Sequence, residues 1–391
     1  MDGLPSAIEL AAPRLKLLPL EELAQKLSPA LPLLDDGPVD HSARQQTLRN
    51  AIGWRHRLLD AADGALFRRL GTLAGGFTLD AAEAVASGAP VEDVLEGISS
   101  LVEVSLLERP AEAGQSRFSM LETIREYALA QLHAAGEERK THRRHADFYL
   151  NLVEQAESEL AMAKQAEWLR RLEAERANLR AALGWAQEEG ETDLGLLMAA
   201  RMWRFWQFRG HLDEGRRWLE DLLAIDSGAP SEARVKGLIG LAGICYWQGE
   251  LDAAEAHYRQ ALDLAGSPEN WWLRGEALFG LAITLACHRG DLEAAAPLER
   301  EFQALAEEHQ DPVAIGMSVM TSAMMRLMAG DLDGARLHCE QVLEMSRAFG
   351  ERWYEGQTCG HLVPSPACRS GTRRPRSNSS GPSRSHGMPA T

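Results

Sequence analysis

The sequence predicts a mainly α-helical protein in which a winged helix-turn-helix domain is followed by an α-solenoid of paired helices. Two observations predict this fold class: a short pattern recurs in the second half of the chain, and a run of short helices with two strands precedes it. The pattern reads Gly, then an acid or His, then Leu and an acid, and it begins at Gly210, Gly249, Gly290 and Gly330. The intervals of 39, 41 and 40 residues are typical of helical repeat arrays.

Each of these four glycines is expected to turn the chain between the two helices of a pair. Glycine adopts the left-handed conformation that commonly ends a helix, and the acid after the leucine favours the positive end of the next helix. Around the second turn, Leu241, Gly249 and Ala261 are spaced as in tetratricopeptide repeats. The observed period exceeds the usual period of about 34 residues, so the connections should be longer. Residues 136–358 are therefore predicted to form tetratricopeptide-like repeats.

Residues 35–135 are predicted to form the winged-helix domain. Helices are expected around residues 48–59, 66–70, 78–85, 91–102 and 122–132, with Thr78 as the N-cap of the third. Residues 104–109 and 117–120 are expected to pair as a β-hairpin, the wing. Long helices are expected over residues 141–162 and 164–189.

The two ends of the chain differ from the middle. Residues 1–34 are expected to form two short helices. Residues 359–391 contain five arginines, five prolines, seven serines and no acidic residue, a composition typical of disorder. Because this change falls abruptly inside a repeat, we hypothesise a reading-frame change near Thr358, which resequencing the gene would test.

Composition and motifs exclude several function classes. A net charge of −16 argues against general nucleic-acid binding, because phosphate would be repelled by most of the surface. Neither a long apolar run nor a signal peptide is found, so a cytoplasmic protein without a membrane partner is expected. The sequence has no triphosphate-binding loop, hydrolase elbow or zinc motif, which predicts no enzyme activity, bound cofactor or metal site. His142 and His145 lie beside two arginines, which disfavour a bound cation.

The charge of the winged unit bears on DNA binding. Residues 70–108 contain no lysine or arginine but seven acidic residues. The helix over residues 91–102 would be the recognition helix, yet all its charged residues are acidic. Recognition of bases and phosphates normally needs Arg, Lys, Asn or Gln. Direct DNA binding by this unit is therefore disfavoured.

Aromatic side chains are concentrated on the repeat helices. Most are expected to pack between helices, while some line a groove, where aromatic residues are favoured anchors for a partner. The candidate partner-binding residues are Trp203, Trp206, Tyr246, Trp247, Trp271 and Trp272.

More than half of the chain resembles the middle of large bacterial STAND (NB-ARC-type) ATPase regulators of transcription, including LuxR- and SARP-like members. The segments on which this resemblance rests are Gly3-Leu4-Pro5 and residues 8–12, 44–48, 66–70, 75–79, 120–128 and 203–218. The resemblance implies that Gly3, Leu4, Pro5, Met120, Leu121 and Glu122 are vestigial nucleotide-contact motifs. Leu121 stands where many members have a phosphate-contacting histidine, and Ser6 and Pro13 also depart from the pattern.

In that family a P-loop domain binds ATP or ADP, and the resemblance places it upstream of Met1. It implies that residues 1–34 are a remnant of the nucleotide module and that this chain is a C-terminal fragment. The resulting interpretation is a non-catalytic signal-sensing fragment whose repeats bind a protein or small-molecule effector. Three alternatives remain: a DNA-binding transcription factor acting through the winged helix, an ATPase completed by a separate P-loop chain, and the nonfunctional product of a broken gene.

Overall fold

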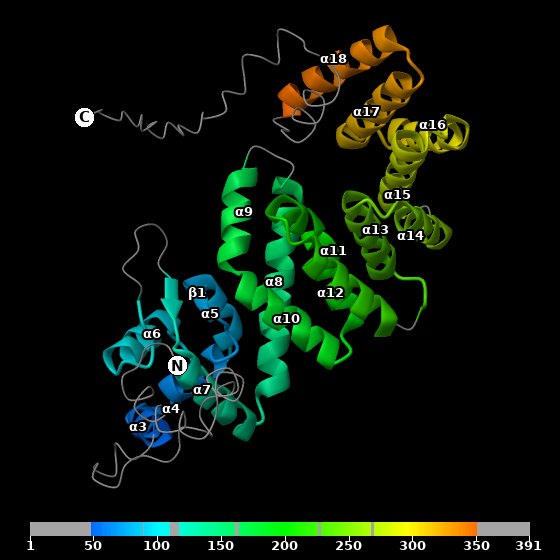
Figure 1. The fold of residues 1–391 in the computed structure, drawn as a ribbon. Coiled ribbons are helices and arrows are strands. Elements are labelled where there is room, and N and C mark those ends of the chain that lie inside the picture. Colours follow the sequence, from blue (N-terminus) through cyan, green and yellow to red (C-terminus); the bar gives the residue numbers. More distant parts are fainter. Residues whose placement is uncertain are drawn as a thin grey trace, which may run out of the picture.

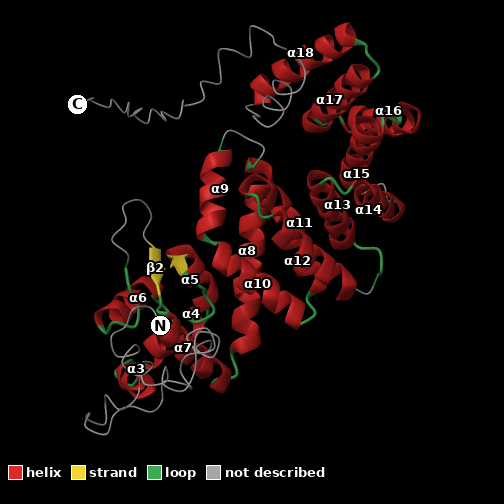
Figure 2. Ribbon diagram, in the orientation of Figure 1, coloured by secondary structure: helices red, strands yellow, loops and turns green. Residues whose placement is uncertain are grey.

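The computed structural model describes residues 48–349, apart from residue 89 and the gaps 110–116, 161–163, 226–227 and 267–269. The described chain is mainly α-helical, as Figure 2 shows, and consists of a winged helix-turn-helix domain followed by a tetratricopeptide-like α-solenoid. The fold class predicted from the sequence is therefore confirmed. The expectations for residues 1–34 and 359–391 lie outside the described residues.

The winged-helix domain lies at one end of the described chain (Figure 1). Its elements are α3 (Leu48–His56), α4 (Ala61–Leu70), β1 (Gly76–Thr78), α5 (Leu79–Ala86), α6 (Val94–Glu103), β2 (Arg117–Ser119) and α7 (Glu122–Ala134). Thr78 caps α5 as predicted, because its side chain accepts a hydrogen bond from the backbone of Ala81 at 3.3 Å. Asp60 caps α4 in the same way.

The wing differs from the predicted hairpin. β2 pairs antiparallel with β1, a strand that the sequence did not predict, and residues 104–109 contribute only a single bridge from Glu108 to Ser119. Ser105 has a positive φ of 56°, and the amides of Leu106 and Leu107 both bond to the carbonyl of Leu101. The chain thus leaves α6 in a tight turn that buries both leucines, whereas a strand would place them on opposite faces.

Three helices connect the wing to the repeats: α8 (Glu138–Glu159), α9 (Gln165–Ala174) and α10 (Arg176–Glu188). The single helix predicted over residues 164–189 is therefore wrong, because the helix is interrupted at Glu175. The carboxylate of Glu175 is only 3% exposed and is bonded to three side chains. The interruption turns this carboxylate inward.

The solenoid consists of helix pairs stacked away from the winged unit (Figure 1). The pairs are α11 (Thr192–Arg209) with α12 (Leu212–Ile225), α13 (Glu232–Gln248) with α14 (Leu251–Leu264), α15 (Trp271–Thr284) with α16 (Leu292–His309), and α17 (Pro312–Met328) with α18 (Leu332–Phe349). A π-helical turn, η4 (Leu285–Arg289), extends α15. One hydrophobic core runs without interruption from the winged unit into the third pair.

The four predicted corner glycines lie between the helices of these four pairs. Gly210, Gly249, Gly290 and Gly330 have φ values of 75°, 82°, 65° and 81°. After three of them, the next amide bonds to a carbonyl five residues earlier, as in His211 to Trp206 at 2.8 Å. At Gly290 the corresponding bond, from Asp291 to Leu285, spans six residues. The π turn thus absorbs one additional residue, in agreement with the 41-residue interval that ends there.

Glycines within the helices allow close packing. A Cβ atom at Gly215 would lie 2.2 Å from the ring of Trp206, and one at Gly280 would lie 2.2 Å from the ring of Tyr258. The glycine series 237, 240 and 243 faces Leu196, Ala200 and Trp203 of α11. This series therefore serves helix packing.

Candidate functional site

The surface of α6 is the first candidate site, because a winged helix-turn-helix domain normally reads DNA with this helix. Its inner face is packed, with Ile98 and Leu101 buried and Gly97 in close contact with α4. The exposed residues on and just before α6 are Glu92, Asp93, Leu95, Glu96, Ser99 and Glu103. The accessible face is thus acidic, with one apolar residue. This face of α6 offers no positively charged side chain to the phosphates of DNA.

Most arginines of the winged unit bond within the protein. Arg68 and Arg69 both pair with Glu137, at 2.5 and 2.7 Å. Arg125 pairs with Glu122 at 2.7 Å. The wing arginine, Arg117, is ion-paired with Glu175. These ion pairs stabilise the winged unit, and they neutralise arginines that could otherwise contact the phosphates of a nucleic acid.

The segment that resembles a nucleotide contact runs from a buried residue, Met120, to an exposed one, Glu122. Met120 is 6% exposed, Leu121 is half-buried, and Glu122 accepts hydrogen bonds from Arg125 that lower the pKa of its carboxyl. A role of this segment in nucleotide contact stays a prediction. Gly3, Leu4 and Pro5 lie outside the described residues.

A buried polar network docks the wing onto the helices that follow. Asn178 of α10 is fully buried and accepts a hydrogen bond from the amide of Ala74 at 2.6 Å. Its amide nitrogen donates to the carbonyl of Gly76 at 3.0 Å and to Glu175 at 2.8 Å. Arg117 also donates to the carbonyl of Gly76, at 2.6 Å. No pattern in the sequence marks this network.

The network continues into α8. The hydroxyl of Tyr149 donates to Glu175 at 2.9 Å, and burial beside this carboxylate raises the tyrosine pKa. His145, one helical turn earlier, is fully buried, and burial lowers its pKa to about 3, so the imidazole is neutral near pH 7. Because Asn178 and Tyr149 are both buried and both bonded to Glu175, the wing is held in one orientation relative to α8 and α10.

The six aromatic candidates differ widely in accessibility. Trp206 is fully buried against Gly215, so it has no surface to offer a partner, which contradicts its assignment as an anchor. Trp247 is 43% exposed. The other four are half-buried: Trp203, Tyr246, Trp271 and Trp272.

The four half-buried candidates also have partners within the chain: Tyr246 packs edge-on against Trp247, and Trp272 packs edge-on against Trp271. The ring of Trp203 stacks against Arg204, with 4.2 Å between the guanidinium carbon and the ring centroid. Trp271 stacks on His309, with ring centroids 4.1 Å apart. Trp247 therefore remains the most accessible of the six anchors.

A charged cluster that the sequence analysis did not identify spans α8, α11, α13 and α15. Glu157 pairs with Lys236 at 2.9 Å and with Arg201 at 3.3 Å. Burial, together with the charge of Glu157, raises the pKa of Glu276 to about 7, although Lys236 and Arg204 oppose this shift. Glu276 is thus a carboxyl group that is partly protonated near neutral pH. Charged residues at non-adjacent positions of four helices give no signal in the sequence.

Among the described residues, no cluster of three or more His, Cys, Asp or Glu could hold a metal ion. No described helix is both long and apolar enough to cross a membrane. Cys245 and Cys339 are buried free thiols, and burial raises the pKa of each.

The fold and its polar network define a class of protein: a winged helix-turn-helix domain docked onto a solenoid of tetratricopeptide-like repeats. Residues 59–133 match the family described as winged helix-turn-helix domain. A protein of Mycobacterium tuberculosis, provisionally named an HTH-type transcriptional regulator, is 33% identical over 368 residues. That similarity covers 90% of this chain and 41% of the mycobacterial protein.

A second M. tuberculosis protein, which is uncharacterised, is 35% identical over 142 residues, or 35% of this chain and 36% of that protein. This chain thus spans about two-fifths of the length of the curated regulator that it matches. Among solved structures, the STAND protein with a tetratricopeptide repeat sensor from Pyrococcus horikoshii has a TM-score of 0.47 at 14% identity. That similarity covers 92% of this chain and 56% of the archaeal one, and it carries no functional assignment.

Proposed function

We propose that this chain is a non-catalytic regulatory and signal-sensing part of a STAND-type transcriptional regulator. In this proposal the repeats bind a protein or small-molecule effector, and the winged unit is a docking element. The similarity to a protein named as a transcriptional regulator supports the regulatory role. The motifs that resemble STAND regulators support the assignment to that class. A cytoplasmic location and a separate nucleotide-binding domain as a further partner belong to the same proposal.

The observation that carries the proposal is the acidic accessible face of α6. A recognition helix must approach phosphates closely, and Glu92, Glu96 and Glu103 would repel them. The wing is the second element that normally contacts DNA, yet Arg117 bonds to Glu175 and Gly76 instead. Both elements thus fit contacts within a regulator better than contacts with a duplex.

DNA binding is the alternative function, and one observation favours it: residues 59–133 match a family whose fold is a DNA-binding one. The alternative of an ATPase completed by a separate P-loop chain follows from the resemblance alone. Our proposal predicts that the purified chain turns over no ATP above background.

Trp247 is the proposed centre of the effector surface, because it is the most accessible of the predicted aromatic anchors. Its ring packs edge-on against Tyr246, with centroids 5.9 Å apart, which holds the indole in place. It lies near a corner of the solenoid, two residues before Gly249. Pre-ordered, exposed tryptophans are common centres of binding energy.

The test is site-specific photocross-linking with benzoylphenylalanine at position 247 in cells that express the chain. The matched control carries the same group at position 225, because Ile225 is a similarly exposed apolar residue at the end of α12. We expect a discrete cross-linked product from position 247 that the substitution Tyr246→Ala weakens. Equal cross-linking from both positions would refute the assignment of the effector surface.

A further inference from the structure

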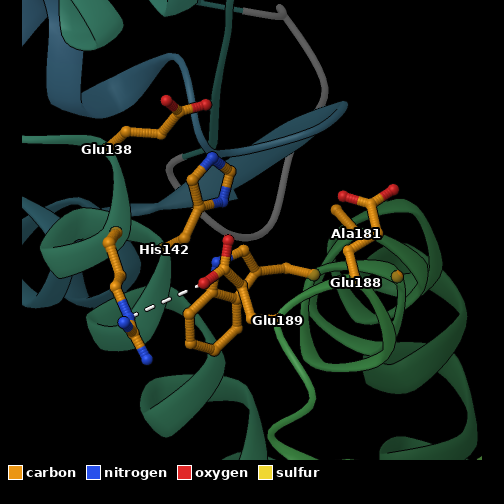
Figure 3. Close-up of a pocket in the computed structure, with 8 residues that line it drawn as sticks. Glu138, His142, Ala181, Glu188 and Glu189 are labelled. Atoms are coloured by element: carbon orange, nitrogen blue, oxygen red, sulfur yellow. Dashed lines mark ion pairs between the residues drawn. The ribbon is translucent and has the colours of Figure 1, made fainter.

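A cavity of about 360 Å³ lies between the start of α8 and the end of α10, apart from the repeat surface proposed above. Figure 3 shows Glu138 and His142 of α8 on one side, Ala181 and Glu188 of α10 on the other, and Glu189 between them. The lining residues are Glu138, Arg139, His142, Ala181, Gly184, Trp185, Glu188 and Glu189. Its size lies within the range of small-molecule sites, about 300–1,000 Å³.

The charge of this cavity is unbalanced. Three carboxylates line it, against a single guanidinium, that of Arg139. Arg139 lies 3.6 Å from Glu189 and 3.7 Å from Glu191, so its charge is already shared. Glu188 forms no ion pair with any residue that the structure describes. Burial lowers the pKa of His142, so the imidazole contributes no positive charge near pH 7.

One polar atom at the cavity lacks a protein partner among the described residues: Nδ1 of His142 is buried without a hydrogen bond. Trp185 is only 7% exposed. The rings of His142 and Trp185 are nearly parallel, at 10°, with centroids 6.3 Å apart. The cavity therefore combines excess negative charge with an aromatic wall and an unpaired imidazole nitrogen.

We propose that this cavity is a binding site for an organic cation, a small molecule with a guanidinium or primary ammonium group. Carboxylates and an indole face attract such a cation in complementary ways: the carboxylates by charge, and the indole by its ring quadrupole. Glu188 supplies the counter-charge, with a contribution from Glu138, whose carboxylate also lies 2.6 Å from Nδ1 of His133. Trp185 supplies the apolar wall. The site does not depend on the proposed effector surface at Trp247, so either can fail alone.

The experiment is isothermal titration calorimetry of the full chain with n-butylguanidinium, compared with its neutral isostere n-butylurea. We expect heat from the guanidinium only. Glu188→Gln should weaken binding about fivefold, equivalent to about 1 kcal/mol, the upper value for a solvent-accessible ion pair. The matched control is Glu308→Gln, which makes the same charge change at an exposed position of α16 outside the cavity and should leave affinity unchanged.

A second variant tests the cavity rather than the charge. Ala181 is half-buried on α10, so Ala181→Leu adds a good helix former that fills the cavity without entering the core. We expect it to abolish binding of n-butylguanidinium while its circular dichroism stays unchanged. Absence of heat up to about 10 mM ligand, equal binding of the urea, or an equal loss in Glu308→Gln would each overturn the proposal.

Discussion

Replacing Asn178 with alanine should loosen the wing from the solenoid. Asn178 is the only residue that bonds both to the segment before β1 and to Glu175 among the described residues. The substitution leaves the amide of Ala74 without its acceptor. It also removes the bond that the side chain of Asn178 donates to the carboxylate of Glu175. We therefore expect the interface between β1 and α10 to open more easily.

The size of the effect follows from the three hydrogen bonds. A neutral bond contributes about 1 kcal/mol, and a bond to a charged group contributes about 1.5–3 kcal/mol. The carbonyl of Gly76 keeps its bond from Arg117, so its loss is small. The bonds to Ala74 and Glu175 then sum to about 2.5–4 kcal/mol of lost stability.

Hydrogen exchange of peptides that cover residues 72–79 would measure this loss as a lower free energy of opening. The control is Gln303→Ala, which removes one exposed bond to Glu307, a helical pair worth less than about 0.5 kcal/mol. A decrease below about 1 kcal/mol for Asn178→Ala, or one equal to the control, would refute the view that this network holds the wing.

Two further predictions concern the solenoid. Gly215→Ala should destabilise the chain by about 1–3 kcal/mol in urea unfolding, because the added Cβ atom would lie 2.2 Å from Trp206. The control, Gly316→Ala, should be neutral or stabilising, because its Cβ atom would meet only Met345, at 3.7 Å. Equal effects of the two variants would contradict this packing. Glu276→Gln should remove a pH dependence of the free energy of unfolding. The pKa of Glu276 is raised from 4.5 to about 7 in the folded chain, so the native protein loses stability as pH rises between these values. The variant should therefore be more stable than the native chain by up to about 3 kcal/mol at pH 8 and by little at pH 4. A gain that does not depend on pH would exclude this titration as the cause.

The repeat architecture was predictable because its signal is local. Glycine at a left-handed helix end is required by the backbone, so the period of Gly210, Gly249, Gly290 and Gly330 marks the corners directly. The longer second interval, of 41 residues, even corresponds to a structural feature, the π turn before Gly290. What the pattern missed is the residue after the glycine: Asp291 and Asp331 cap the next helices with their side chains.

The wing and the docking network were not predictable from local patterns. β2 pairs with β1, about 40 residues earlier in the chain, and a strand of three residues is too short to show alternation. The interruption at Glu175 depends on side chains from the wing and from α8 that local sequence does not reveal.

The aromatic candidates illustrate a third limit. Trp203 and Trp206 are three residues apart, which places them on one side of α11, but this spacing does not reveal how deeply each side chain is covered. The depth is decided by Gly215 on the next helix, whose missing side chain makes room for Trp206. To predict which side chains of a repeat surface are accessible, one must therefore know how neighbouring helices pack as well as the residue pattern of one helix.

The central claim is that the winged unit is a docking element and reads no DNA, and fluorescence anisotropy with labelled duplexes tests it most directly. Duplexes from the gene's own upstream region and of random sequence would be titrated at about 50 and 200 mM salt. We predict no binding below about 10 µM on either duplex, because the accessible face of α6 is acidic. Submicromolar binding that weakens steeply with salt would contradict the account.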